Sequence, residues 1–576
     1  MTRLITRLAA ALLVPLVLIV PAGARAPAAF QPQTHKGSSL DDLVKLVPDE
    51  AALVVVFPDF AKAIAGVAAF GTAAGIEDLA ELEAEELLDE LDIAALTDEL
   101  RKHLRADGPL VLAVTEPGEE PLLLATLKTP PAGAPGALVE LKGDVLLAAP
   151  GTVALQAARS ASGKFAHRFA QQVRDVLAGH DLAAYVNVPG WSLEIEQALE
   201  TGEMLTQVGM QAGAPTTQAA EANAALISAI FGMMRSVAAE TDAVAIALGF
   251  DRGGAHLSQR VHFKPDGRAA AYLKSVRKSE KELLRGLRGP AGSMIVAAEW
   301  TLPPEVETLS GRFLRAIVAT HPALKEDESF KTKMRSLTEF YRKLDGYSMV
   351  GDVGPPAPLL RFSGLYLTTE AQWATEHLWE LWELSSCFTT TLAPGFSMSV
   401  SQEAGQIGDV KVHVGHLQFK TEDAESQRLL DAIYGNLAVC VAPHPAGVAL
   451  GTGSPEVARE RLEKLLTGKG PLLSDDARVI AARKQLSPRP QGLALIDPLG
   501  FMKGMLEATE VLSDELGPMP LPEIEWPQKP GPYVAFGLYL YPTACGVEAY
   551  LPAEVVKNMA DVFQRLEKAA VPTEPY

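Results

Sequence analysis

Ser275 and Lys278 have the S-x-x-K spacing that penicillin-binding proteins and β-lactamases use to place a nucleophile beside a lysine. That chemistry also needs a K-T-G motif, which the sequence lacks, since Lys128-Thr129 is followed by Pro130. Ser275 lies in a strongly charged stretch, which is typical of a solvated helix face. No G-x-S-x-G, H-E-x-x-H, C-x-x-C, Walker or EF-hand motif occurs either. We therefore expect no cofactor and no metal site, and favour a protein that is not an enzyme.

His413 and His416 are the closest pair of candidate metal ligands. They fall within residues 410–419, whose alternation of apolar and polar residues predicts a strand. Residues three apart on a strand point to opposite faces, so the two rings cannot share a metal. A β-bulge at Gly415 would change that geometry.

Two further segments resemble ion-binding sites. The turn 451–455 precedes a predicted helix whose free N–H groups could bind a phosphate. Ser454 as the capping residue and Pro455 as the first helical residue explain the same sequence as an ordinary helix start. The acid-rich stretch 77–99 could supply oxygen ligands for calcium, but a helix would spread its carboxylates along one solvated face.

Two apolar helical stretches and one proline-rich loop are candidate interaction surfaces. One stretch is rich in methionine, which adapts to irregular surfaces, and the other in tryptophan, which anchors interfaces. Both stretches can equally cover a sheet as part of the core. The proline-rich loop 517–532 should be extended and exposed. The residues that we expect at such surfaces are Phe231, Met234, Trp379, Trp382 and Trp526.

Short apolar runs bounded by glycine and proline predict antiparallel hairpins along the whole chain. In the first half the predicted strands are 53–57, 110–114, 122–127, 138–141, 145–148, 182–188, 244–250 and 257–263. In the second half they are 294–298, 437–441, 448–450, 493–496, 533–541 and 547–551. Residues 60–70, capped by Asp59, and residues 76–104 are predicted to be helical.

These elements predict an α+β fold with two related lobes of antiparallel hairpin sheets, each with helices packed on one face. The expected lobes are residues 40–288 and 289–576. The second half repeats the order of elements of the first, which favours an internal duplication. Because the residues themselves show little identity, convergent use of β-hairpins is the alternative.

The N-terminus has the order of a secretory signal peptide. Arg3 and Arg7 precede an apolar run, 8–20, and Ala22-Gly23-Ala24 follows as a cleavage site. The run is short for a membrane span, which needs about 20 residues. We therefore expect a signal peptide at 1–24, cleaved at Ala24 or Ala26, a spacer at 25–39, and a periplasmic or extracellular protein without a stable membrane anchor.

The net charge of the chain limits the kinds of partner that it can bind. The 576 residues carry a formal net charge of −20, with 48% hydrophobic residues. An acidic surface repels phosphate backbones, so nucleic acid is not an expected partner. The three cysteines, Cys387, Cys440 and Cys545, would permit one disulfide in an oxidising compartment. Two of them lie in apolar strand-like runs, so we expect buried free thiols and no structural bridge.

The signal peptide, the entry 46–52 into a hydrophobic strand, and strand–turn–helix segments such as 448–466 resemble exported bacterial proteins assigned to domains of unknown function. That resemblance implies no activity, substrate or functional residue. The sequence alone thus favours an exported, non-enzymatic protein that binds an unidentified protein or apolar ligand. A hydrolase without a short signature and a structural component of the cell envelope are the alternatives.

Overall fold

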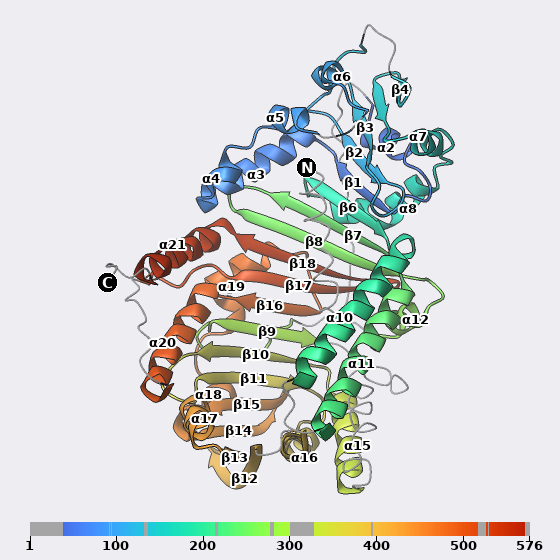
Figure 1. Ribbon diagram of the computed structural model, residues 1–576. Coiled ribbons are helices and arrows are strands. Elements are labelled where there is room, and N and C mark those ends of the chain that lie inside the picture. Colours follow the sequence, from blue (N-terminus) through green and yellow to red (C-terminus); the bar gives the residue numbers. More distant parts are fainter. Residues whose placement is uncertain are drawn as a thin grey trace, which may run out of the picture. The chain divides into compact units, whose positions relative to one another are not determined.

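The computed structural model describes residues 38–570 except 92, 94, 132–135, 213–216, 277–281, 300–327, 393–395, 517–525 and 528 (Figure 1). The expected signal peptide and most of the spacer lie outside these residues. The chain divides into two compact units. Unit 1 contains the residues up to Thr201, with Gly232–Lys274 and Leu538–Lys557. Unit 2 contains Gly202–Phe231, Ser275–Gly537 and the residues from Asn558 onward.

These units differ from the lobes 40–288 and 289–576 in three segments, 202–231, 275–288 and 538–557. Residues 538–557 belong to unit 1, because strand β18 (Ala544–Pro552) pairs antiparallel with β8 (Gly254–Phe263) over nine residues of each strand. Residues 202–231 belong to unit 2. A continuous boundary in the sequence therefore does not separate the two compact units.

The fold is a mixed α+β fold in which the strands named here pair antiparallel, as predicted. Unit 1 has β1 (Leu53–Phe57), β2 (Leu110–Val114), β3 (Leu122–Thr126), β4 (Val139–Lys142), β5 (Val145–Ala148), β6 (Leu182–Asn187), β7 (Thr241–Phe250), β8 and β18. Their pairings give the order β4-β5-β3-β2-β1-β6-β7-β8-β18. The pairs β2–β3, β4–β5 and β7–β8 are hairpins, whereas the other pairings join strands that no tight turn connects.

Unit 2 contains a second run of antiparallel strands. They are β9 (Met294–Glu299), β10 (Gly346–Val353), β11 (Leu360–Leu367), β12 (Phe396–Ile407), β13 (Val410–Thr421), β14 (Leu437–His444), β15 (Gly447–Gly453) and β16 (Gly492–Ile496). Their order is β16-β9-β10-β11-β15-β14-β13-β12, and the strands lie in that order in Figure 1. Strand β17 (Val534–Tyr541) spans the boundary between the units.

The two halves of the chain use the same order of pairing. The first strand of each half, β1 or β9, pairs with the strand that follows it and with a later strand, β6 or β16. The third strand pairs in each case with the second member of a further hairpin, β5 or β15. Among the described residues of the first half, the hairpin β12–β13 and helix α16 (Ala371–Leu392) have no counterpart.

Helices pack on both faces of the sheets, so the expectation of one covered face was wrong. In unit 1, Val54 and Val56 pack with Phe165 of α8 (Lys164–Gln172), whereas Phe57 packs with Phe60 of α3 (Phe60–Ala74) in a separate cluster. Strands buried on both faces need apolar residues at every position, and β1 reads Leu-Val-Val-Val-Phe. The lack of alternation in β1 was the signal for this arrangement.

Unit 2 shows the same two-sided packing. On β15, Val448 and Leu450 belong to the cluster that contains Leu378 of α16. A Cβ at Gly451 would point the other way, to within 2.3 Å of Ala458 O in α18 (Pro455–Thr467). Residues 450 and 451 face opposite sides of the strand, so α16 and α18 cover opposite faces.

The helix predictions had mixed outcomes. The helix 60–70 is confirmed as α3, and Asp59 accepts a hydrogen bond from Lys62 N as its cap. The helix 76–104 was wrong, because three short helices, α4 (Glu77–Ala80), α5 (Ala84–Asp89) and α6 (Asp98–His103), occupy this stretch. A run of like charges does not favour one continuous helix, since carboxylates three and four residues apart repel each other. Strands β10, β11 and β12 were not predicted.

The remaining helices connect the strands. They are α2 (Leu40–Val44), α7 (Thr152–Arg159), α9 (Arg174–Leu177), α10 (Ser192–Ala212), α11 (Thr217–Glu240), α12 (Arg268–Ser275), α15 (Glu328–Lys343), α17 (Ala424–Tyr434), α19 (Ala477–Arg483), α20 (Pro498–Leu516) and α21 (Ala553–Ala570). Helices α19 and α20 flank β16 in the sequence, and the junction between β16 and α20 is where polar side chains gather.

Candidate binding site

A crevice of about 270 Å³ lies within unit 2 where β16 ends and α20 begins. Its lining comes from the entry to β9 at Ala291–Ser293, from the end of β10, from Arg478 of α19, from the start of α20 and from residues 526, 527 and 529–531. These segments are distant in the sequence and are brought together by the pairing of β9 with β10 and β16. Both apolar and charged residues line the crevice.

Asp497 forms part of the floor and caps helix α20. It follows the last residue of β16, and its side chain accepts a hydrogen bond from Gly500 N at 2.9 Å. Pro498 is the first helical residue, where a missing N–H costs nothing. Only 4% of Asp497 is exposed, so its charge needs a partner inside the protein.

Arg478 supplies that partner. Its Nη1 donates to Asp497 Oδ2 at 2.9 Å and to Gly531 O at 3.0 Å. Its Nη2 donates to the Tyr533 hydroxyl at 3.1 Å, and that hydroxyl donates in turn to Gly292 O at 2.6 Å. The guanidinium also lies 4.5 Å from the centre of the Tyr533 ring. This single side chain thus ties α19, the start of α20 and the entry to β9 together.

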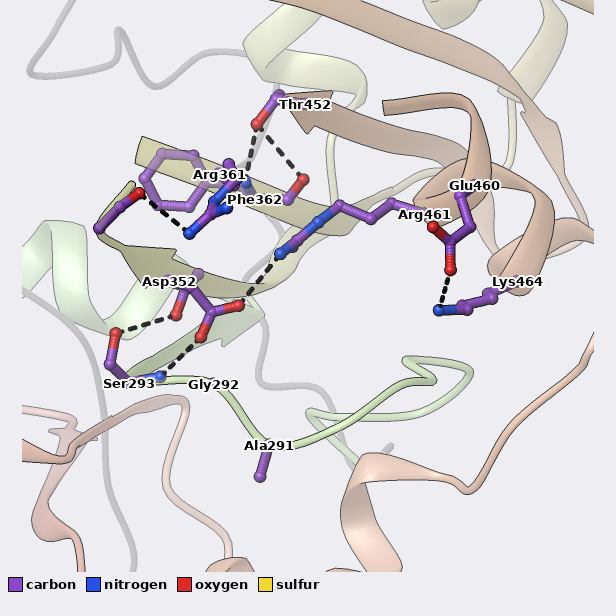
Figure 2. A network of polar contacts seen from close by, with 12 residues as sticks. Ala291, Gly292, Ser293, Asp352, Arg361, Phe362, Thr452, Glu460, Arg461 and Lys464 are labelled. Atoms are coloured by element: carbon purple, nitrogen blue, oxygen red, sulfur yellow. Dashed lines mark hydrogen bonds and ion pairs between the residues drawn. The ribbon is translucent and has the colours of Figure 1, made fainter. Parts of the chain in front are cut away.

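Asp352 is the second acid of the crevice, and Figure 2 shows its carboxylate between Ser293 and Arg461. Asp352 Oδ1 accepts from Ser293 N at 3.2 Å, and Asp352 Oδ2 accepts from Arg461 Nη2 at 3.0 Å. The Ser293 hydroxyl donates to Gly351 O. Arg361 lies opposite Asp352 on β11 and donates to Gly354 O. Both acids of the crevice are therefore neutralised by arginines.

The rim of the crevice carries two lysines and one tryptophan. Lys503 lies on α20, and its nearest acid is Glu507, 3.7 Å away one helical turn later. Lys529 is exposed and forms no ion pair with the residues that the structure describes. Trp526 is half-buried in the wall, whereas Pro527 and Pro530 beside it are exposed. The rim thus combines positive charge with a flat aromatic surface.

The crevice contains no arrangement for acid–base or nucleophilic catalysis among the described residues. Its two carboxylates are held by arginines, and the only hydroxyls named above, those of Ser293 and Tyr533, donate to backbone carbonyls. Burial raises the pKa of Tyr533 well above its usual value, although Arg478 opposes this shift. Within the described part of the chain, no group of three or more His, Cys, Asp or Glu side chains could hold a metal ion.

Trp526 is the sequence-predicted residue that lines this crevice. The described residues of the proline-rich loop form neither helix nor strand, and Gly531 among them is buried, so the loop is not exposed throughout as expected. Residues 517–525 and 528 lie outside the described residues.

Trp379 and Trp382 lie together on α16, with ring centres 4.5 Å apart, and belong to the core of unit 2. Trp379 is 4% exposed, so it offers no surface to a partner. A Cβ at Gly415 would come within 2.3 Å of the Trp379 ring, which shows how closely α16 approaches β13. Of the two readings that the sequence allowed for this helix, the structure shows the core.

Phe231 and Met234 are half-buried on α11. Buried Ile246 is 3% exposed, whereas Val55 is half-buried like the two α11 residues. Phe231 and Met234 are therefore more exposed than Ile246 but fall in the same burial range as Val55. Helix α10 carries more exposed apolar side chains. These are Met204, Leu205 and Val208, each about 60% exposed.

The other candidate motifs have structural explanations. His413 lies near Trp379, with ring centres 6.3 Å apart, and His416 lies on the opposite face near Glu403. Pairing of β12 with β13 continues through Gly415 without a bulge. In the turn 451–455, Ser454 accepts from Val457 N and caps α18 as an ordinary helix start. Lys278 of the S-x-x-K pattern lies outside the described residues.

Cys440 and Cys545 are free and buried. Burial raises the pKa of Cys440 to about 11 and that of Cys545 to about 12. Such thiols carry almost no thiolate near neutral pH and are poor nucleophiles. The side chain of Cys387 lies outside the described residues.

A larger hollow of about 660 Å³ lies in unit 1 between the end of α11 and the start of α12. Its cations are already engaged. Arg268 pairs with Glu240, Arg235 with Glu196, and Lys264 donates to Ala239 O. We therefore regard the smaller crevice in unit 2, whose lysines have little or no pairing, as the better candidate.

Arg478, Asp497, Lys503 and Lys529 were not singled out from the sequence. The sequence predicted only that a strand ends at residue 496, directly before Asp497 and Pro498. A polar residue at such a junction that also has to be buried is the available signal, but its partner Arg478 is identified only by the fold.

No family, no curated protein and no solved structure matches the chain. Among the described helices, none is both long and apolar enough to span a membrane. The function therefore has to be argued from the crevice itself.

Proposed function

We propose that the chain is an exported, non-enzymatic binding protein and that the crevice of unit 2 receives its ligand. The observation that carries this proposal is the contrast between the floor and the rim. Ion pairs fix the floor, in which Asp497 and Asp352 are held by Arg478 and Arg461. A rigid floor costs little conformational entropy when a ligand binds.

The same observation argues against the hydrolase alternative. A general base needs a pKa near the working pH and a free lone pair, whereas both carboxylates of the crevice are committed to arginines. A purely structural envelope protein would not need a hollow of about 270 Å³ with an aromatic wall. That volume lies just below the range of about 300–1,000 Å³ usual for small-molecule sites, so a small ligand fits better than a protein domain.

Filling the crevice tests this proposal. A Cβ at Gly531 would lie 3.6 Å from Leu499 Cδ1, an ordinary contact, so Gly531→Phe can place a ring in the crevice. A Cβ at Gly136 would meet nothing within 4 Å, so Gly136→Phe adds the same ring to the surface of unit 1. Each protein is incubated with the small-molecule extract of the source cells and weighed by native mass spectrometry.

We expect a defined mass increase in the wild-type protein and in Gly136→Phe, and none in Gly531→Phe. No increase in the wild-type protein, or an increase that survives in Gly531→Phe, would contradict the proposal. Export is tested separately, by the N-terminal mass of the protein in fractionated cells. A mature chain should begin at Arg25 or Pro27 and be absent from the cytosol.

We also infer that the two halves arose by internal duplication. The shared pairing order of β1–β6 and of β9–β16 supports this inference. Within it, the hairpin β12–β13 with α16 is an insertion in the second half. The inserted tryptophans then serve the core of that half, and the binding crevice occupies the shared framework.

A further inference from the structure

We propose that the ligand of this crevice carries an anionic group, a carboxylate or a phosphate, which binds between Lys503 and Lys529. This inference rests on the proposed function and names the chemistry of its ligand. Arg478, Lys503 and Lys529 line the crevice against Asp352 and Asp497. Arg461 neutralises Asp352 from outside the lining, so within the described residues Lys503 has only the exposed Glu507 as an acidic partner and Lys529 has none.

Arg478 is not available as a binding group for the ligand. Arg478 already donates to Asp497, to the backbone carbonyls of Gly531 and Ala291, and to the Tyr533 hydroxyl. A ligand that displaced Arg478 would leave Asp497 buried without a counter-charge, which is strongly unfavourable. The positive charge that a ligand can use is therefore that of the lysines.

Lys503 and Lys529 come from different segments on the crevice lining. The pair Lys503–Glu507 is exposed, with 48% and 43% of the side chains accessible, and its separation of 3.7 Å is long. Exposed pairs of this kind contribute little to stability, so an incoming anion can replace Glu507. Lys529 has no ion pair to break within the described residues.

A lysine is a point charge with three donors and no fixed plane. The two lysines therefore accept either a carboxylate or a phosphate, and do not select the planar group that a free arginine would select. Trp526 offers a flat indole in the same crevice, against which an apolar or aromatic part of the ligand can pack. A small ring that carries an acidic group satisfies both features. A positive rim on a chain of net charge −20 also concentrates anions locally.

Isothermal titration of the full mature chain tests this proposal with three probes. Benzoate supplies a ring and a carboxylate, benzamide supplies the same ring without charge, and inorganic phosphate supplies an anion without a ring. The variants are Lys503→Gln, Lys529→Gln and their combination. Lys411→Gln on β13 is the matched control, because it removes one exposed lysine of the same unit away from the crevice.

We expect benzoate or phosphate to bind the wild-type chain and Lys411→Gln with equal Kd, and the double variant to weaken that binding by about tenfold or more. Binding of benzoate alone identifies a carboxylate, and binding of phosphate alone identifies a phosphate. Benzamide that binds as well as benzoate, or anion binding unaffected by the double variant, would overturn the inference. So would the absence of binding by both anions. The mass-increase experiment with Gly531→Phe does not depend on charge, so the proposed function can survive such a result.

Discussion

The two strand-to-helix junctions at Asn187 and Asp497 show how one framework can carry different chemistry. In unit 1, Leu53 of β1 pairs with Val186, and Asn187 then donates its N–H to Ala52 O at 2.9 Å. In unit 2, Met294 of β9 pairs with Ile496, and Asp497 donates its N–H to Ser293 O at 2.8 Å. The backbone contacts are the same, and the side chain differs by one charge.

The rest of each junction follows from that charge. In unit 1 the indole of Trp191 donates to Ala52 O at 3.0 Å and covers the joint without any ion pair. In unit 2 the corresponding position is Phe501, which is 38% exposed. Here the ion pair between Arg478 and Asp497 holds the junction together. The junction that contains Asp497 borders the crevice. The two junctions thus share their backbone hydrogen bonds and differ in the ion pair between Arg478 and Asp497.

The largest effect should come from removing the counter-charge of Asp497. Arg478→Met leaves a buried carboxylate unpaired and should lower the free energy of unfolding by about 3–5 kcal/mol, measured by urea denaturation. The double variant Arg478→Met/Asp497→Asn should recover much of this loss, because Asn187 shows that an uncharged amide fits the same joint. If the single variant lost less than about 1 kcal/mol, the ion pair would not hold the joint.

Between pH 6.5 and pH 4, a buried histidine should make the stability of unit 1 sensitive to acid. His262 is 8% exposed, and burial lowers its pKa to about 4 from an ordinary 6.5. The unfolded chain then binds a proton below pH 6.5 that the folded chain refuses until about pH 4. The contribution of neutral His262 to the free energy of unfolding is therefore fully present above pH 6.5. It falls as the pH drops, and about 3 kcal/mol of it is lost at pH 4.

The variant His262→Gln should show a smaller loss than the wild-type chain between pH 6.5 and pH 4 in urea denaturation. His167→Gln removes an exposed histidine of the same unit and should behave like the wild-type chain. Identical acid profiles of wild type and His262→Gln would show that His262 is not the sensitive group.

Equivalent glycines of the two joints should give smaller and similar effects. A Cβ at Gly190 would lie 3.3 Å from Ala52 Cβ, and one at Gly500 would lie 3.1 Å from Asp497 Cγ. Neither neighbour can move freely, so each Gly→Ala variant should lose about 1 kcal/mol of stability. Thermal unfolding measures both variants, and Gly136→Ala, where a Cβ meets nothing, is the control. A gain in stability at either joint would break the equivalence.

The smallest effects should come from the aromatic side chains that follow those glycines. Trp191→Phe loses the hydrogen bond to Ala52 O and should cost about 1 kcal/mol. Phe501→Leu changes an exposed side chain and should stay within about 0.5 kcal/mol of the wild type. Equal losses in urea denaturation would mean that Phe501 covers its joint as Trp191 does.

Much of the fold could be predicted because it depends on patterns that extend over only a few residues. Short β-branched and apolar runs gave the hairpins of β2 with β3, β7 with β8, and β14 with β15, since turn residues fix such pairings locally. Asp59 and Ser454 were recognised as caps for the same reason. The long acidic stretch 76–104 misled the prediction, because its leucine spacing indicated a helix while its charges disfavoured one.

The crevice depended on contacts that no local pattern contains. Arg478 and Asp497 are 19 residues apart, and Arg478 reaches Ala291 from 187 residues away, so their meeting is decided by the pairing of β9 with β16. Trp526 was predicted as a surface residue from its proline-rich surroundings, but only the fold places it beside two lysines. Trp379 shows the reverse case, because Gly415, on a strand distant in sequence, makes the space that buries it.

The sequence by itself determined the antiparallel α+β class, the caps and most of the strands, because hydrophobic periodicity and turn chemistry act over a few residues. It also showed the repeated order of elements in the two halves. Only the tertiary structure decided that both faces of the sheets are covered, that β18 pairs with β8, and that Asp497 is buried against Arg478. Burial and charge pairing depend on which distant segments meet, and that is a property of the folded chain rather than of any one segment.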